Sequence, residues 1–230
     1  METIINAWLA IWLYVMMGIG IYLSWLVYKN RKTWDFINII CTLAIVVLVL
    51  HVIEEWVLPG GLHYSYNIDH NSTILSRYPM NRLTDMITNF GGVLLGCIVL
   101  KFWGFRKPAG IAVMLFSVFE VVIHIVIGIH SMHTFGAYGQ NVLYSPGLIT
   151  SLFGFLPICI ALAVHLFKKA NRPTRTQWIM AIVAMFGFCF LLINLPEMTL
   201  GDENSPYVFT DRGYYEQFAE EYEADNNLLY

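Results

Sequence analysis

Charged residues are scarce in this chain of 230 residues, since Asp, Glu, Lys and Arg together make up only 13%. Hydrophobic residues make up 57%, and the mean hydropathy is +0.60. Soluble globular domains carry about 25% charged residues, so this composition excludes an ordinary soluble fold and indicates that lipid is the solvent. The four cysteines all fall inside apolar stretches, so we expect buried small side chains and no disulfide framework.

Six apolar stretches are long enough to cross a bilayer, because a transmembrane helix needs about 20 mostly apolar residues. They predict spans at residues 4–28, 35–58, 83–103, 110–130, 146–167 and 177–199. We therefore predict an all-α polytopic membrane helical bundle in residues 1–200, with no room for a separate soluble domain. Residues 201–230 form an acidic and aromatic C-terminal tail, which we expect to be solvated, with a short interfacial helix as the alternative.

The basic residues are unevenly distributed along the chain. Ten of the thirteen Lys and Arg residues lie in three short connections, which carry Lys29, Arg31 and Lys32; Lys101, Arg106 and Lys107; and Lys168, Lys169, Arg172 and Arg175. Cytoplasmic loops carry the excess of Lys and Arg, so these connections should face the cytoplasm and both termini should lie on the outer side. We expect a multi-pass protein of the cell membrane whose partner is the lipid bilayer and which binds no nucleic acid.

The second predicted span ends in a costly group of polar side chains. His51, Glu54 and Glu55 follow an apolar run and share an arc of about 100 degrees on the helix. In the fourth span, Glu120 and His124 are four residues apart and therefore lie on one helix face. An ionisable residue at the centre of a span costs about 2.5 to 3.5 kcal/mol, so we expect these five residues to face the bundle interior and to meet one another.

Two imidazoles and three carboxylates at one level of a helical bundle are typical metal ligands. Bundles build such sites from inward Glu and His one turn apart, and this set suits one or two divalent ions, with zinc or iron favoured. We predict His51, Glu54, Glu55, Glu120 and His124 as ligands and Glu55 also as the catalytic general base. The structural alternative is a neutral or paired hydrogen-bond network that fixes the helix register.

Other polar residues lie near the same end of the spans. One stripe of the third span carries two of them, and two histidines lie one turn apart at the end of the fourth span. We predict a substrate-binding or supporting role for Asp85, Asn89, Tyr144, His130 and His133. The histidines have a simpler interpretation as interfacial residues.

The string His51-Val52-Ile53-Glu54-Glu55 resembles the signature of the HXXEE family of small multi-span proteins of mostly bacterial origin. Glu120 and His124, and Tyr144-x-Pro146-Gly147 leading into Thr150, also resemble the pattern of this family. The resemblance covers most of the membrane region and excludes the tail. It implies the bacterial cytoplasmic membrane and supports the choice of site residues, but it implies no established reaction, cofactor or substrate.

The function predicted from these residues is a membrane-embedded metal-dependent enzyme that acts on a lipid-like or apolar substrate near the outer face, by hydrolytic or di-metal oxidative chemistry. A proton- or cation-coupled transporter is the first alternative, although transporters often show duplicated halves and broken mid-membrane helices. Haem bound by His51 and His124 is a further alternative. The close group of imidazoles and carboxylates suits a hard metal ion better than a porphyrin. A non-catalytic membrane scaffold is the remaining alternative.

Overall fold

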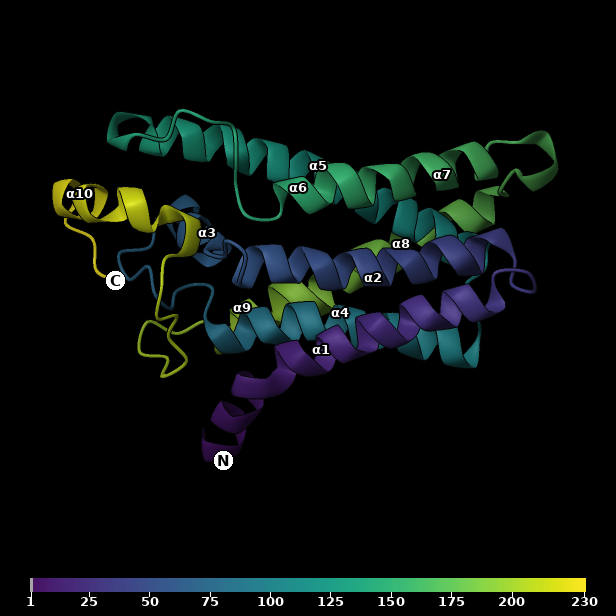
Figure 1. Ribbon diagram of the computed structural model, residues 1–230, viewed down its shortest axis with the longest axis horizontal. Helices are drawn as coiled ribbons and strands as arrows, with labels where there is room; N and C mark the ends of the chain where they lie inside the picture. Colours follow the sequence, from purple (N-terminus) through teal and green to yellow (C-terminus); the bar gives the residue numbers. More distant parts are fainter. Residues whose placement is uncertain (1) are drawn as a thin grey trace.

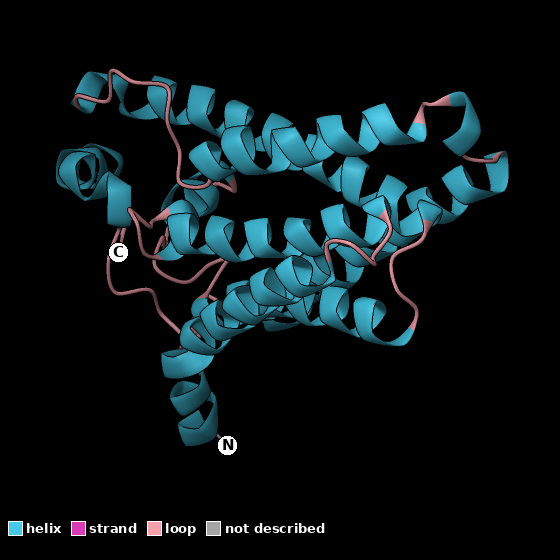
Figure 2. Ribbon diagram, turned by 45° about the vertical axis from the view of Figure 1, so that its right-hand side comes forward, coloured by secondary structure: helices cyan, strands magenta, loops and turns pink. Residues whose placement is uncertain are grey.

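The computed structural model describes residues 2–230 as a bundle of helices, in which the sole β feature is an isolated bridge between Ile74 and Leu229. Both chain termini lie at the same end of the bundle, here called the terminal end, and the connections rich in Lys and Arg lie at the opposite, basic end (Figure 1). Figure 2 shows that the loops gather at these two ends.

The helices follow one another along the chain with few long connections. Their bounds are α1 (Glu2–Asn30), α2 (Phe36–Trp56), α3 (Leu62–Asp69), α4 (Arg82–Phe102), α5 (Lys107–Phe135), η1 (Gly136–Tyr138), α6 (Leu148–Thr150), η2 (Ser151–Phe155), α7 (Leu156–Leu166), η3 (Lys169–Asn171), α8 (Arg175–Cys189), η4 (Phe190–Asn194), α9 (Leu195–Leu200), η5 (Gly213–Tyr215) and α10 (Glu216–Asn226).

Six helical segments of the described chain are long and apolar enough to cross a membrane. They cover Thr3–Asn30, Phe36–Trp56, Arg82–Phe102, Lys107–Tyr138, Leu148–Leu166 and Arg175–Leu200. Each overlaps one predicted span, and the fourth extends furthest beyond its prediction of 110–130. The predicted number and order of spans is therefore confirmed, as is the all-α bundle expected of a membrane protein.

Helix α2 is the central helix of the bundle. It contacts α1 along its length and also packs against α4, α5 and α7. In its most apolar window 44% of the residues are buried, against only 6% in the span Arg175–Leu200, which lies at the periphery. A helix that is hydrophobic on all sides is expected in such a buried position. The polar side chains His51, Glu54 and Glu55 of α2 are accordingly buried.

Two spans contain a π-helical segment that ends two residues before a proline. The segment η2 precedes Pro157, and η4 precedes Pro196. In both, the N–H of the residue before the proline bonds to the carbonyl oxygen five residues earlier. Proline has no N–H and its ring clashes with the carbonyl four residues before it, so a widened turn accommodates the ring within a continuous span.

The C-terminal segment folds back over the terminal end, where α10 packs near α3 and α5 (Figure 1). Tyr215 is 0% exposed and its ring centroid lies 5.7 Å from that of Tyr64 and 5.0 Å from that of Phe135. Arg212 also pairs with Glu223 at 2.7 Å. The expectation of a solvated tail is therefore wrong for the buried residues of this segment. Despite the acidic composition of the tail, they join a second apolar core, which consists of Tyr64, Leu75, Phe135, Tyr215, Phe218 and Ala219.

The second core gives a test of how firmly the tail is held. Phe135→Ala should lower the free energy of unfolding by about 3 to 5 kcal/mol, since Phe135 is 1% exposed at the centre of this core. Phe186→Ala is the matched control, because Phe186 is 68% exposed on the membrane-facing surface. Equilibrium unfolding of the purified protein in mixed micelles measures both, and equal losses would contradict the assignment.

Candidate metal centre

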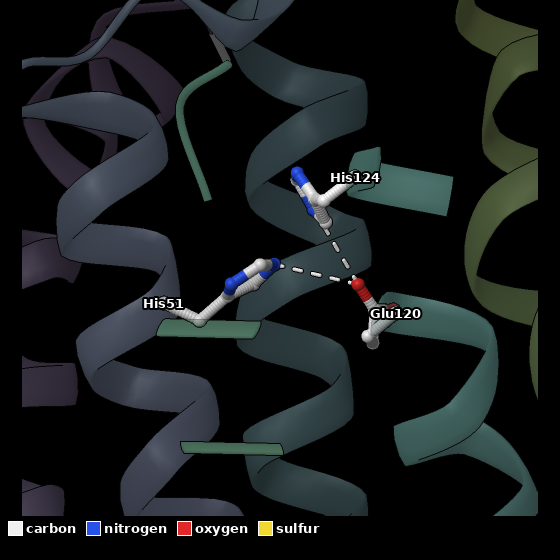
Figure 3. A group of neighbouring side chains, drawn as sticks. All are labelled: His51, Glu120 and His124. Carbon is white, nitrogen blue, oxygen red and sulfur yellow. Dashed lines mark ion pairs between the residues drawn. The ribbon is translucent and has the colours of Figure 1, made fainter. Parts of the chain in front are cut away.

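Four side chains of α2 and α5 converge toward the terminal end of the bundle. His51 and Glu55 are one turn apart on α2, and Glu120 and His124 are one turn apart on α5, so each helix directs one imidazole and one carboxylate inward. Figure 3 shows His51, Glu120 and His124 pointing toward one another. The side chains are between 3% and 12% exposed. We refer to these four residues as the His/Glu cluster.

The carboxylates of the cluster meet both Nε2 atoms. Glu55 Oε1 lies 3.0 Å from His51 Nε2 and 3.3 Å from His124 Nε2. Glu120 Oε2 lies 3.4 and 3.6 Å from the same two nitrogens. Ligand atoms about 2.1 Å from one ion lie up to about 4.2 Å apart, so these spacings fit a shared ion. Ligand atoms of His51, Glu120 and His124 all lie within 4.8 Å of one another.

Glu54 points to a different partner, the start of the helical span Leu148–Leu166. Its Oε1 accepts hydrogen bonds of 3.0 Å from both the Tyr144 hydroxyl and the Ile149 backbone N–H. Its Oε2 accepts from the Thr150 backbone N–H at 2.8 Å and from the Thr150 hydroxyl at 2.6 Å. The first N–H groups of a helix lack partners within the helix, and a carboxylate is favourable there. Glu54 thereby ties α2 to the fifth span.

Thr150 connects Glu54 to His51. Its hydroxyl oxygen lies 2.6 Å from Glu54 Oε2 and 2.8 Å from His51 Nδ1. Glu54 and the Gly147 carbonyl oxygen, 3.2 Å away, can only accept, so the hydroxyl hydrogen is donated to them and Thr150 accepts from the Nδ1–H of His51. A neutral His51 in this tautomer carries its lone pair on Nε2, which faces the carboxylates of Glu55 and Glu120. Such opposed acceptors need a proton or a cation between them.

His124 is held by packing against a glycine. Within the described residues its buried Nδ1 has no hydrogen-bond partner. A Cβ atom at Gly147 would lie 2.2 Å from His124 Cε1, and the φ of +95° at this position also favours glycine. The ring of His124 lies edge-on to that of His51, with centroids 4.7 Å apart. Gly147 therefore leaves the space that the imidazole occupies.

The other sequence-predicted residues lie outside the cluster. Asp85 and Asn89 pair with each other on α4, where Asn89 Nδ2 donates to Asp85 Oδ1 at 2.6 Å. His130 is exposed and lies 2.5 Å from Asp69 Oδ1, and His133 is also exposed. Across residues 2–230 no hydrogen bond or ion pair joins these side chains to the four cluster residues.

The resemblance to the HXXEE pattern included Gly147 and Thr150, but sequence reasoning assigned neither residue a role in the site. A signal for them exists, because Pro146-Gly147 directly before an apolar run marks the beginning of a helix. The first N–H groups of that helix need a partner, and an acidic residue in a neighbouring span can supply one. In the structure Glu54 is the carboxylate that accepts from these N–H groups.

The model of a family described as "Protein of unknown function with HXXEE motif" matches residues 42–162, more than half of the chain. The chain belongs to the HXXEE family. The match begins in α2 and ends in α7, so it includes every element that contributes to the His/Glu cluster and to the contacts of Glu54. No curated protein and no solved structure matches the chain. In this HXXEE protein, His51 and Glu55 of the motif face the cluster and Glu54 faces the neighbouring span.

The role of Glu54 is testable by an isosteric change. Glu54→Gln should lower the free energy of unfolding by about 2 to 3 kcal/mol, because the amide NH₂ then opposes groups that donate to the carboxylate. Glu197→Gln is the control, since the described residues offer that carboxylate only the Tyr66 hydroxyl, at 2.8 and 3.0 Å. Unfolding in mixed micelles compares the two, and a Glu54→Gln variant as stable as the control would disprove the capping role.

Proposed function

We propose that the His/Glu cluster binds one or two divalent ions, zinc or iron, and that this HXXEE protein is a membrane-embedded enzyme acting on a lipid-like or otherwise apolar substrate. The observation that carries the proposal is the orientation of His51. The Thr150 hydroxyl, which donates to Glu54, accepts from its Nδ1–H, so its Nε2 lone pair points at two carboxylates. Metal-binding histidines commonly have their other ring N–H held in this way by a second group.

The geometry divides the roles among the residues. We assign His51, Glu120 and His124 as ligands, because one ligand atom of each lies within 4.8 Å of the other two. Glu55 is an additional ligand or the general base, since its Oε1 lies beside both imidazoles. We assign Glu54 a positioning role, because donors from the fifth span and Tyr144 occupy both of its oxygens. A bound divalent ion would supply Lewis acidity and an activated water, and both hydrolytic and oxidative chemistry use these ligand types.

We further propose that the basic end faces the cytoplasm of a bacterial cell and that the termini lie outside. The three connections that hold ten of the thirteen Lys and Arg residues all lie at this end of the bundle. Positively charged loops are retained on the cytoplasmic side, which supports this orientation. The His/Glu cluster then lies nearer the outer face.

The metal is tested by elemental analysis of protein purified in detergent without chelator. We expect near-stoichiometric zinc or iron in the wild type and its loss in His124→Ala and Glu120→Gln. Thr150→Val should weaken metal affinity about 10- to 100-fold, because it removes the oxygen that holds His51 Nδ1. His130→Ala is the matched control and should retain the metal, since His130 is exposed and bonded to Asp69. A metal-free wild type would reject the metal centre and leave a protonated ion-pair network.

Enzymatic function is tested separately by Glu55→Gln. If Glu55 is the general base, this variant retains at least one metal ion yet loses about 100-fold or more of the turnover, the contribution typical of general-base catalysis. The assay is metal-dependent conversion of lipid esters in vesicles, followed by mass spectrometry. Ion-driven uptake into the same vesicles, with no conversion of lipid in the wild type, would favour the transporter instead.

A further inference from the structure

An apolar cavity of about 210 Å³ lies between α2, α4, α5 and α8. No charged side chain lines it in the described part of the chain, and its walls include Leu48, Gly92, Val113, Ala184 and Phe155. Small residues form part of its wall, and Gly92 lets its neighbours approach closely: a Cβ atom there would lie 3.3 Å from Phe188 and 3.4 Å from Leu48. The cavity occupies the basic-end side of the His/Glu cluster.

Two helices independently place the cavity one turn from the cluster. Leu48 precedes His51 by three residues on α2, and Phe116 precedes Glu120 by four residues on α5; both line the cavity. These separations correspond to about 4.5 and 6 Å along the helix axes. Phe155 lines the cavity as well, and its ring centroid lies 5.3 Å from that of His51. The cavity therefore ends at the Phe155 ring, which packs against the imidazole of His51.

The cavity also borders the lipid-facing surface. Leu95 is 41% exposed and Ala184 is exposed, and both line the cavity from α4 and α8. Glu120 is the most exposed residue of the cluster, at 12%. Apolar cavities of about 150 Å³ stay free of water and accept apolar ligands. In a bilayer the abundant apolar ligand is a hydrocarbon chain.

We infer that this cavity binds the hydrocarbon chain of a lipid-like molecule, with the polar group of the same molecule at the His/Glu cluster. This inference rests on the proposed function and adds the chain-binding part of the substrate site. The chain enters between α4 and α8 and extends toward the basic end. Its polar end lies beside His51 and Glu120, because these residues follow the cavity-lining residues on their helices.

Photo-crosslinking with palmitic acid that carries a mid-chain diazirine tests the inference on the full-length protein in lipid vesicles. We expect mass spectrometry to locate the crosslinks on cavity-lining residues such as Leu48, Leu95 and Val113, and unlabelled palmitic acid to compete. Ala184→Phe, which fills the cavity from α8, should reduce this labelling about tenfold, equivalent to about 1.4 kcal/mol of binding free energy. Val113→Phe fills it from α5 and should have the same effect.

The matched control is Val183→Phe, because Val183 adjoins Ala184 but is 66% exposed and does not line the cavity. Its labelling should equal that of the wild type. Labelling spread over lipid-facing residues such as Phe186, and unchanged in both filling variants, would overturn the inference. Metal content is measured on the same samples. A metal-free wild type therefore rejects the metal centre, while diffuse labelling of a metal-loaded wild type rejects only the cavity assignment.

Discussion

The hydrogen bonds that Glu54 accepts from the beginning of the fifth span determine the geometry of the whole site. They join two segments about 95 residues apart in sequence and place Thr150 against His51. The same docking brings Gly147 against the ring of His124. One carboxylate that contacts no imidazole thus positions both. A carboxylate that accepts several hydrogen bonds is well satisfied even when buried, which is why Glu54 is tolerated inside an apolar bundle.

The second carboxylate of the motif, that of Glu55, has different partners. Glu55 faces only the two imidazoles, so its burial is compensated by a proton or an ion and not by a set of backbone donors. Buried charges are costly in free energy unless they are paired. In the HXXEE protein the four costly side chains lie together in the His/Glu cluster, toward the terminal end of α2 and α5. A polar cluster beside an apolar cavity suits a molecule with one polar and one hydrocarbon end.

Composition and spacing were sufficient to predict the spans and the convergence of α2 with α5. Exposing the polar face of an apolar helix to lipid is costly, so the polar faces of two such helices are expected to meet. They were not sufficient to separate Glu54 from Glu55. Adjacent residues on a helix point about 100 degrees apart, and the identity of the neighbour on each side depends on tertiary packing. Pro157 and Pro196 mark the π-helical segments in the sequence, but the prediction of spans from hydropathy does not use proline positions. Burial of Tyr215 in the tail was hidden by the surrounding acidic residues.

The order of residues on the two helices explains why the cluster closes. Both α2 and α5 run from the basic end to the terminal end, but α2 carries His before Glu and α5 carries Glu before His. Parallel helices with opposite orders place His51 level with Glu120 and Glu55 level with His124, at 3.4 and 3.3 Å. If both helices had the same order, the two carboxylates would face each other and repel in a low-dielectric interior. The motif on α2 is therefore matched by a partner helix of reversed order, and each helix presents one imidazole and one carboxylate to the centre of the cluster.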